Sequence, residues 1–407
     1  MTIFLLLALI SAVVTFGASM VVYTVSHKYR LYPKIRERDV HTRPTPRLGG
    51  IAMFLGIMVA FGVSYLIAAQ FAPLRLVFSN PTQILAILGA ALLIVALGVA
   101  DDLWDLDWMT KLAGQFIAAG LVAWQVQILS LPIGGLTVGS GWMSIVITIM
   151  VIVIVMNMIN FIDGLDGLVA GVALIANGTF FIYSYLLVRD TSPTNYFNLA
   201  SLIAAILVGA CAGFLPLNWR PAKLFMGDAG ALLVGLFMAT SAIAITGQID
   251  PTALNRSQLF PAFIPILLPV AILIIPLLDF GLAVFRRVRA GKSPFSADRK
   301  HLHHRLLDMG HSHLHAVLIF YGWTAAASIG CLLYFVLPVY LGLPSWYASI
   351  FLVLALLACT IVTLAPLSRR KAAEAATQLT PIQNDPNEAS VGFDPLDAAS
   401  TLTKDNS

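Results

Sequence analysis

The chain alternates between long apolar runs and short polar connections. Eleven of the runs hold about 20 mostly apolar residues, the length that an α-helix needs to cross the hydrocarbon core of a bilayer. They lie at residues 2–25, 50–70, 82–100, 110–129, 143–160, 165–188, 199–217, 229–247, 261–285, 314–338 and 346–367. The pattern therefore predicts an all-α polytopic membrane protein with about eleven transmembrane helices.

Composition supports this interpretation. Hydrophobic residues make up 59% of the chain and charged residues only 11%, whereas soluble domains carry about 25% charged residues. Such a chain cannot cover a water-facing surface. The first run lacks a basic start and an obvious cleavage site, so we interpret it as a retained span and not as a signal peptide.

The basic residues predict the orientation of these spans. All but three of the 24 Lys and Arg residues fall in connections on one side, and the exceptions are Arg75, Arg189 and Arg256. By the positive-inside rule, the N-terminus is outside and the C-terminus cytoplasmic. Residues 131–141 are glycine-rich and predict a small outer hairpin. Residues 1–368 would form the transmembrane domain, followed by a disordered cytoplasmic tail at residues 369–407.

Aspartates lie where several apolar runs end, on the predicted cytoplasmic side. They are Asp101, Asp102, Asp105, Asp163, Asp166 and Asp228. Carboxylates at this depth are costly and usually functional. Asp101 and Asp102 oppose the macrodipole at a helix C-terminus and have no capping role there, whereas Asp107 suits the cap of the next helix. Gathered at one surface, the carboxylates would repel each other, so we expect a cation among them.

The fifth run ends in the segment NMINFIDGLDGLVAG. Asn157, Asn160, Asp163 and Asp166 follow each other at three-residue intervals, and a glycine comes after each aspartate. These glycines allow tight turns or a close approach by a ligand. One aspartate could cap the next helix, but two aspartates and two asparagines exceed what a cap needs. Asp228 is either an N-cap or a ligand of a divalent metal, which takes oxygen ligands and leaves room for substrate phosphates.

Two basic loops on the same side offer donors for phosphate. One loop contains Arg299, His303, His304 and Arg305. In the other loop, Arg43, Thr45, Arg47 and the turn at Gly49–Gly50 are candidates to hold a phosphate near the membrane surface. Clustered Arg and His side chains suit a phosphate or a diphosphate. The alternative is a loop that holds topology or touches anionic lipid. Zinc is disfavoured because no cysteine accompanies the histidines and their spacing fits no standard site.

Five motifs occur in a characteristic order: PTPRLGG, DDLWD, NFIDGLDGL, LFMGDAG and HLHHRLL. On these motifs the chain resembles the polyprenyl-phosphate N-acetylhexosamine-1-phosphate transferases, the family that includes WecA, TagO and MraY. The resemblance covers residues 1 to about 367. It implies transfer of N-acetylglucosamine-1-phosphate from UDP-GlcNAc to undecaprenyl or decaprenyl phosphate, which yields polyprenyl-diphosphate-GlcNAc and UMP. This reaction is the first membrane step of a cell-envelope polysaccharide pathway.

The resemblance also implies a role for each motif residue. The site would lie at the cytoplasmic face of a bacterial plasma membrane and use Mg²⁺, with Mn²⁺ as a substitute. The implied catalytic residues are Asp101, Asp102, Asp163 and Lys111, and the implied metal ligands are Asp228, Asp163 and Asp166. The implied substrate-binding residues are Asn160, Asn218, Arg43, Thr45, Arg47, His303, His304 and Arg305.

Several alternatives stay open at the level of sequence. A UDP-MurNAc-pentapeptide phosphotransferase is the main rival, although that branch has three consecutive histidines where this chain has His303-His304-Arg305. A secondary transporter of a nucleotide or lipid would place ionisable residues near the bilayer midplane. A lipid-binding scaffold gives no reason for the aspartates. The expected partners are a UDP-amino sugar, a polyprenyl phosphate and the membrane, with no nucleic acid. The oligomeric state is open, with a homodimer as one option.

Overall fold

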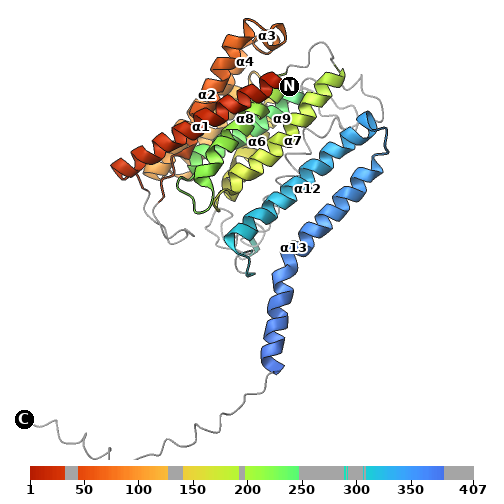
Figure 1. Ribbon diagram of the computed structural model, residues 1–407. Helices are drawn as coiled ribbons and strands as arrows, with labels where there is room; N and C mark the ends of the chain where they lie inside the picture. The colour runs from red at the N-terminus through yellow and green to blue at the C-terminus, as the bar shows by residue number, and fades with distance from the viewer. Residues whose placement is uncertain are drawn as a thin grey trace, which may run out of the picture. The chain divides into compact units, whose positions relative to one another are not determined.

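The computed structural model describes residues 1–32, 45–126, 141–191, 198–246, 288–289, 291, 306 and 309–379. Regular structure in these ranges is entirely helical, and many of the helices lie side by side (Figure 1). The helices are α1 (Thr2–Tyr29), α2 (Gly49–Ala68), α3 (Ala72–Val77), α4 (Pro81–Trp104), α5 (Trp108–Ala123), α6 (Gly141–Ile162), α7 (Leu168–Thr191), α8 (Leu199–Asn218), α9 (Gly227–Thr246), α12 (His313–Tyr340) and α13 (Trp346–Leu379).

Membrane-length helices dominate the described part of the chain. Nine of its helices are long and apolar enough to cross a bilayer, which confirms the predicted polytopic helical fold. The helix predicted at 110–129 is shorter than expected, because α5 has 16 residues and ends at Ala123. Beyond that end, Gln125 bonds to the first turn of α4 through Thr82 and Gln83. The predicted span 261–285 and most of the predicted hairpin at 131–141 lie outside the described residues.

The chain divides into two compact units, Met1–Thr363 and Leu364–Ser407. Helix α13 continues to Leu379, so the predicted start of the tail at residue 369 falls inside a helix. The sequence KAAEAAT in this stretch is rich in alanine, the residue with the highest helix propensity. Residues 380–407 lie outside the described part.

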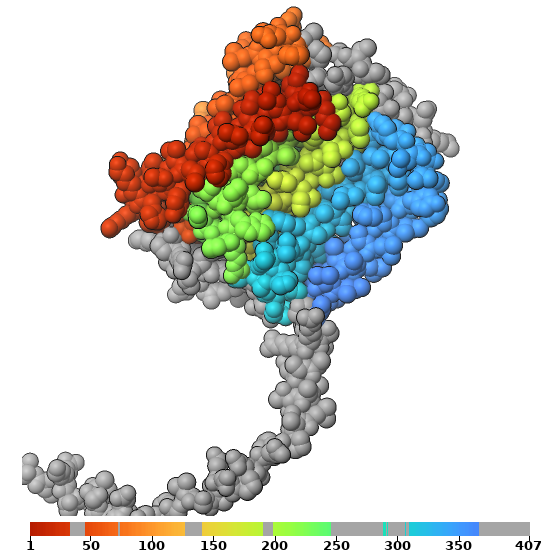
Figure 2. Space-filling model, in the orientation of Figure 1, coloured from red at the N-terminus to blue at the C-terminus, as the bar shows by residue number. Residues whose placement is uncertain are grey.

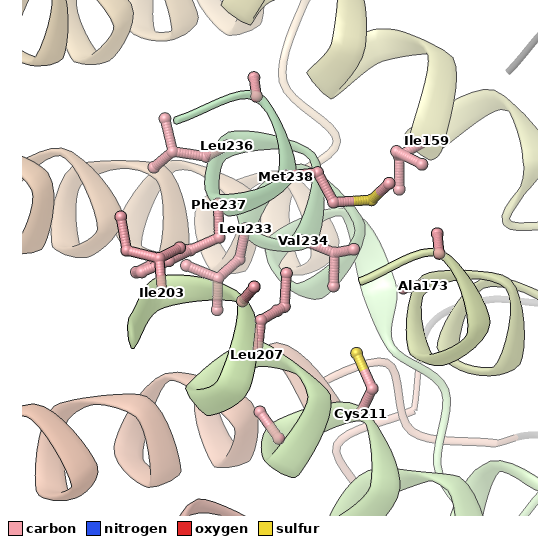
Figure 3. Packing of buried hydrophobic residues seen from close by; sticks show 14 of the residues in the cluster. Ile159, Ala173, Ile203, Leu207, Cys211, Leu233, Val234, Leu236, Phe237 and Met238 are labelled. Atoms are coloured by element: carbon pink, nitrogen blue, oxygen red, sulfur yellow. The ribbon is translucent and has the colours of Figure 1, made fainter. Parts of the chain in front are cut away.

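Helices α8 and α9 form the centre of the first unit. The most apolar window of α9 is 94% buried and that of α8 is 78% buried, against 22% in α1 and 6% in α13. Figure 3 shows Leu207 of α8 facing Leu233 and Val234 of α9. On the face shown in Figure 2, α1 and α12 lie at the surface with α8 and α7 between them. A buried α9 can therefore hold its first residues, Gly227 and Asp228, in a fixed place.

Small residues let α1 pack closely against α8. A Cβ atom added at Gly209 would overlap the carbonyl oxygen of Ala8, and one added at Gly213 would overlap that of Ala12. The Ser11 hydroxyl donates a hydrogen bond to the Ile206 carbonyl at 2.9 Å across the same interface. Pairs of small residues four positions apart are a common means of bringing two membrane helices together.

We expect Gly213→Ala to destabilise the protein by about 1–3 kcal/mol, because its methyl group has no space against the α1 backbone. Gly62→Ala on α2 is the matched control, since nothing lies within 4 Å of its added Cβ, and it should be neutral or slightly stabilising. Thermal unfolding of the purified proteins in detergent measures both effects. Equal stability of Gly213→Ala and the unmodified protein would contradict this packing.

Candidate active site

Four helix ends meet at one end of the bundle: the C-terminal ends of α4 and α6 and the N-terminal ends of α5 and α9. The Nζ atom of Lys111 lies 3.0 Å from Oδ2 of Asp101 and 3.5 Å from Oδ2 of Asp228. The Asn160 side chain hydrogen-bonds to the Asp228 carboxylate. Residues far apart in the sequence are thus brought together, as the positions of the aspartates at helix ends predicted.

The turn between α4 and α5 explains how Lys111 reaches back to Asp101. Asp105 ends α4 with φ 55° and ψ 65°, in the left-handed region, and reverses the chain. The Leu106 amide then donates to Oδ1 of Asp101 at 2.9 Å. Asp107 caps α5 by accepting from the Thr110 amide at 3.0 Å, as predicted. The hydroxyl and amide of Thr110 hold the pKa of Asp107 below its usual value.

Asp102 is held at the same point by the start of α9. Its Oδ1 accepts from the Asp228 amide at 3.4 Å, and Arg47 provides a nearby positive charge. Its Oδ2 is buried and has no hydrogen-bond partner among the described residues. Gly227, with φ +70°, lies directly against this oxygen, and a Cβ there would overlap both Oδ2 and the Arg47 carbonyl. A buried carboxylate oxygen without a donor is suited to a proton or a cation.

The PTPRLGG segment is bound to the LFMGDAG segment by backbone hydrogen bonds. Phe225 donates its amide to the Pro46 carbonyl at 2.8 Å, Gly49 donates to Phe225 at 3.0 Å, and Gly50 donates to Met226 at 2.9 Å. The suggestion that the turn at Gly49 and Gly50 holds a phosphate is therefore wrong, because both amides are used inside the protein and both glycines begin α2. The pairing brings the segment that carries Thr45 and Arg47 to the start of α9.

The second acidic segment, between α6 and α7, lies against the loop between α8 and α9. Oδ2 of Asp166 accepts from the Ala222 amide at 3.2 Å. Asn218 is buried; it accepts from the Gly167 amide at 3.0 Å and donates to the Leu224 carbonyl at 3.1 Å. Its side chain therefore joins the two loops, a positioning role that the predicted substrate contact did not include.

Of the remaining predicted residues, some are described by the structure and others lie outside the described part. Asp163 follows Asn160 at the end of α6, where its amide donates to the Asn160 carbonyl at 3.2 Å. Asn157 instead hydrogen-bonds to Gln115 and to the Val153 carbonyl, so it is a contact between α5 and α6. The predicted residues outside the described part are Arg43, Arg299, His303, His304 and Arg305.

A pocket opens beside Asp166. It is lined by Asp166, Trp219, Arg220, His313, Leu314 and Val317. Its walls therefore come from the acidic segment, the loop after α8 and the first turns of α12. Asp166 therefore both bonds to the loop between α8 and α9 and lines this pocket.

The donor chemistry of the site fits a hard divalent cation. The site has carboxylate oxygens from Asp101, Asp102 and Asp228. One of these oxygens, Oδ2 of Asp102, has no hydrogen-bond partner among the described residues. Among the described residues, however, no three His, Cys, Asp or Glu side chains are grouped to hold a metal by themselves. Mg²⁺ is usually bound through one or two carboxylates together with water and substrate phosphates, so it does not require such a group. The roles predicted for Asp228, Asp163 and Asp166 as metal ligands stay predictions.

A bundle of membrane-length helices that gathers carboxylates, a lysine and an arginine at one end defines a membrane-embedded enzyme for phosphate-bearing substrates, because such groups position and neutralise transferring phosphates. Comparison with known proteins narrows this class. Residues 84–246, which include Asp101, Asp102, Asp163, Asp166 and Asp228, match the family described as glycosyl transferase family 4.

Curated relatives agree over most of the chain. The decaprenyl-phosphate N-acetylglucosaminephosphotransferase of Mycobacterium leprae is 39% identical over 332 residues, which cover 80% of this chain and 82% of that protein. The Mycolicibacterium smegmatis protein of the same name is 40% identical, with 80% of each chain covered. A phospho-N-acetylmuramoyl-pentapeptide-transferase of Halalkalibacterium halodurans is 30% identical over 60% of this chain and 76% of that protein. The chain belongs to the polyprenyl-phosphate N-acetylhexosamine-1-phosphate transferase family.

Proposed function

We propose that this protein transfers N-acetylglucosamine-1-phosphate from UDP-GlcNAc to a polyprenyl phosphate. The observation that carries the proposal is the Asp101–Lys111–Asp228 arrangement, with salt-bridge distances of 3.0 and 3.5 Å. It occurs in a chain about 40% identical over four-fifths of its length to relatives named for this transfer. Similarity to the relative named for N-acetylmuramoyl-pentapeptide is lower in both identity and coverage.

The reaction joins two anions. An oxygen of the lipid phosphate attacks the β-phosphorus of UDP-GlcNAc, and a new P–O bond forms. The bond from that phosphorus to the oxygen bridging the two donor phosphates breaks, and UMP leaves with the electron pair. The barrier is lowered mainly by positioning the two phosphates and offsetting their charge. Asp228 and the unpartnered Oδ2 of Asp102 would hold Mg²⁺, which would supply positive charge that offsets the charge of the two phosphates.

Different residues of the chain supply positive charge, orient the carboxylates and bind the substrates. Lys111, held between Asp101 and Asp228, and Arg47, beside Asp102, supply fixed positive charge. Asp228 has its charge oriented by Asn160. Oδ2 of Asp102 is the oxygen best suited to hold a cation or to accept a proton from the lipid phosphate, because its bonding capacity is unused among the described residues. Asp163, Asp166 and the phosphate-binding loops would hold the nucleotide sugar.

In this proposal the site faces the cytoplasm of a bacterial cell. The loops that contain Arg47, Lys111, Arg220 and Lys223 are on the side with nearly all the basic residues, which is the cytoplasmic side by the positive-inside rule. UDP-sugars are then supplied from the same compartment. The lipid acceptor reaches the site from the inner leaflet, and the product enters a cell-envelope polysaccharide pathway.

A donor screen tests the proposal. Purified protein with decaprenyl phosphate and Mg²⁺ should convert UDP-GlcNAc to UMP and a butanol-extractable lipid, and should not convert UDP-MurNAc-pentapeptide. Chelation with EDTA should stop the reaction, and added Mg²⁺ or Mn²⁺ should restore it. Conversion of UDP-MurNAc-pentapeptide alone would contradict the proposal and identify the protein as a UDP-MurNAc-pentapeptide phosphotransferase. Uptake of donor into vesicles without any product would indicate a transporter.

A further inference from the structure

Tyr321, within the apolar helix α12, reaches the acidic segment between α6 and α7. Its hydroxyl donates a hydrogen bond to the Gly167 carbonyl at 2.5 Å. The same carbonyl accepts a hydrogen bond from the Gly171 amide at 3.0 Å, in the first turn of α7. The Gly167 amide donates to Asn218 at 3.0 Å. Gly167 is therefore held on both its carbonyl and its amide side.

The surrounding residues are shaped to admit the Tyr321 hydroxyl. A Cβ atom added at Gly171 would overlap both the hydroxyl and the ring of Tyr321. On the other side, the Trp219 ring lies tilted against the Tyr321 ring, with 6.5 Å between centroids. Helices α7 and α12 pack side by side along this region (Figure 1). The hydroxyl therefore reaches Gly167 only because Gly171 has no side chain.

Fixing Gly167 also fixes the residue before it. Gly167 has a φ of +76°, which sets the direction in which the chain enters α7. Asp166 precedes it directly and bonds to the Ala222 amide. Three hydrogen bonds of the described residues hold this segment: Asp166 to Ala222, Gly167 to Asn218, and Gly167 to Tyr321. The first goes to the loop between α8 and α9, the second to the last residue of α8, and the third comes from α12.

We propose that Tyr321 is a positioning residue for the reaction: its hydroxyl holds the Asp163–Gly167 segment in place for the nucleotide sugar. This inference rests on the proposed function, because it assumes that Asp163 and Asp166 face the donor. In this proposal Tyr321 acts through Gly167 and not through contact with either substrate. Its effect falls on donor binding and not on the lipid phosphate, since the attachment holds the segment beside Asp166.

Tyr321→Phe tests the proposal, because it removes the hydroxyl and keeps the ring against Trp219. The KM for UDP-GlcNAc should rise about five- to tenfold, the consequence of losing one ordering hydrogen bond. The KM for polyprenyl phosphate and the thermal midpoint should stay near those of the unmodified protein. Tyr334→Phe is the matched control on the same helix, since its hydroxyl bonds to Ser349 at 2.6 Å, and it should leave both KM values unchanged.

Hydrogen–deuterium exchange gives a readout that does not depend on turnover. The amides of residues 164–168 should exchange faster in Tyr321→Phe than in Tyr334→Phe. Gly171→Ala, which displaces the Tyr321 ring, should reproduce both the faster exchange and the raised donor KM. Exchange and KM values in Tyr321→Phe equal to those of the control would overturn the inference. A fall in kcat and thermal midpoint with an unchanged donor KM would assign Tyr321 a purely structural role and overturn it equally. If the unmodified protein turned over no UDP-sugar, the proposed function would fail, while faster exchange would still support the attachment.

Discussion

Asp228→Asn should lower turnover on the order of 10³-fold while the protein still folds and inserts. Asparagine has nearly the same shape as aspartate, so the start of α9 and its packing are preserved. The substitution removes the negative charge that attracts Lys111 at 3.5 Å and that Asn160 orients. It also removes the carboxylate that the family resemblance assigns to Mg²⁺, so any residual activity should require more Mg²⁺ than the unmodified protein. The measurement is conversion of radiolabelled UDP-GlcNAc to butanol-extractable product in washed membranes.

Asp107→Asn is the matched control for this substitution. Asp107 lies at the same end of the bundle, and its carboxylate caps α5 from an exposed position. Asparagine caps helices about as well as aspartate, so activity and stability should stay close to those of the unmodified protein. Full activity in Asp228→Asn, with protein levels equal to the control, would remove Asp228 from the proposed site.

The helix ends show why much of this site could be predicted. The length of the apolar runs locates the spans, and the positive-inside rule assigns their ends to the two sides of the membrane. Aspartates at those ends were therefore expected to converge, and Asp101 and Asp228 do meet at Lys111. The cap at Asp107 was also predictable, because it depends only on neighbouring residues.

Other features depend on partners distant in the sequence, which leave no local pattern. Asn157 was grouped with the site by its spacing, but Gln115 satisfies its amide inside the bundle. Gly49 and Gly50 were interpreted as a phosphate turn, whereas their amides bond to a loop that is far away in sequence. Tyr321 lies within a long apolar run, where no sequence pattern marks it as a residue of the site. The sequence feature related to this contact is Gly171, a glycine inside a predicted helix, and it does not indicate that Tyr321 is the side chain packed against it.

Lys111→Met should lower turnover on the order of 10²-fold, because the ammonium group contacts both Asp101 and Asp228. Methionine keeps the length and most of the packing of the lysine side chain. Without the ammonium, the two carboxylates would repel each other and lose their fixed orientation toward the substrates. The kcat for UDP-GlcNAc in detergent solution measures the loss. Lys223→Met, at an exposed position in the loop between α8 and α9, is the control and should retain activity.

The response to Mg²⁺ separates Lys111 from Asp228. The ammonium competes with a divalent cation for the same carboxylate oxygens, so Lys111→Met leaves the site more negative and should lower the Mg²⁺ concentration needed for half-maximal activity. Asp228→Asn makes the site less negative and should raise that concentration. Mg²⁺-dependent shifts of the thermal midpoint should follow the same opposite directions without any need for turnover. A raised Mg²⁺ requirement in both variants would contradict this competition, and it would mean that Lys111 supports cation binding by holding Asp101 and Asp228 in place.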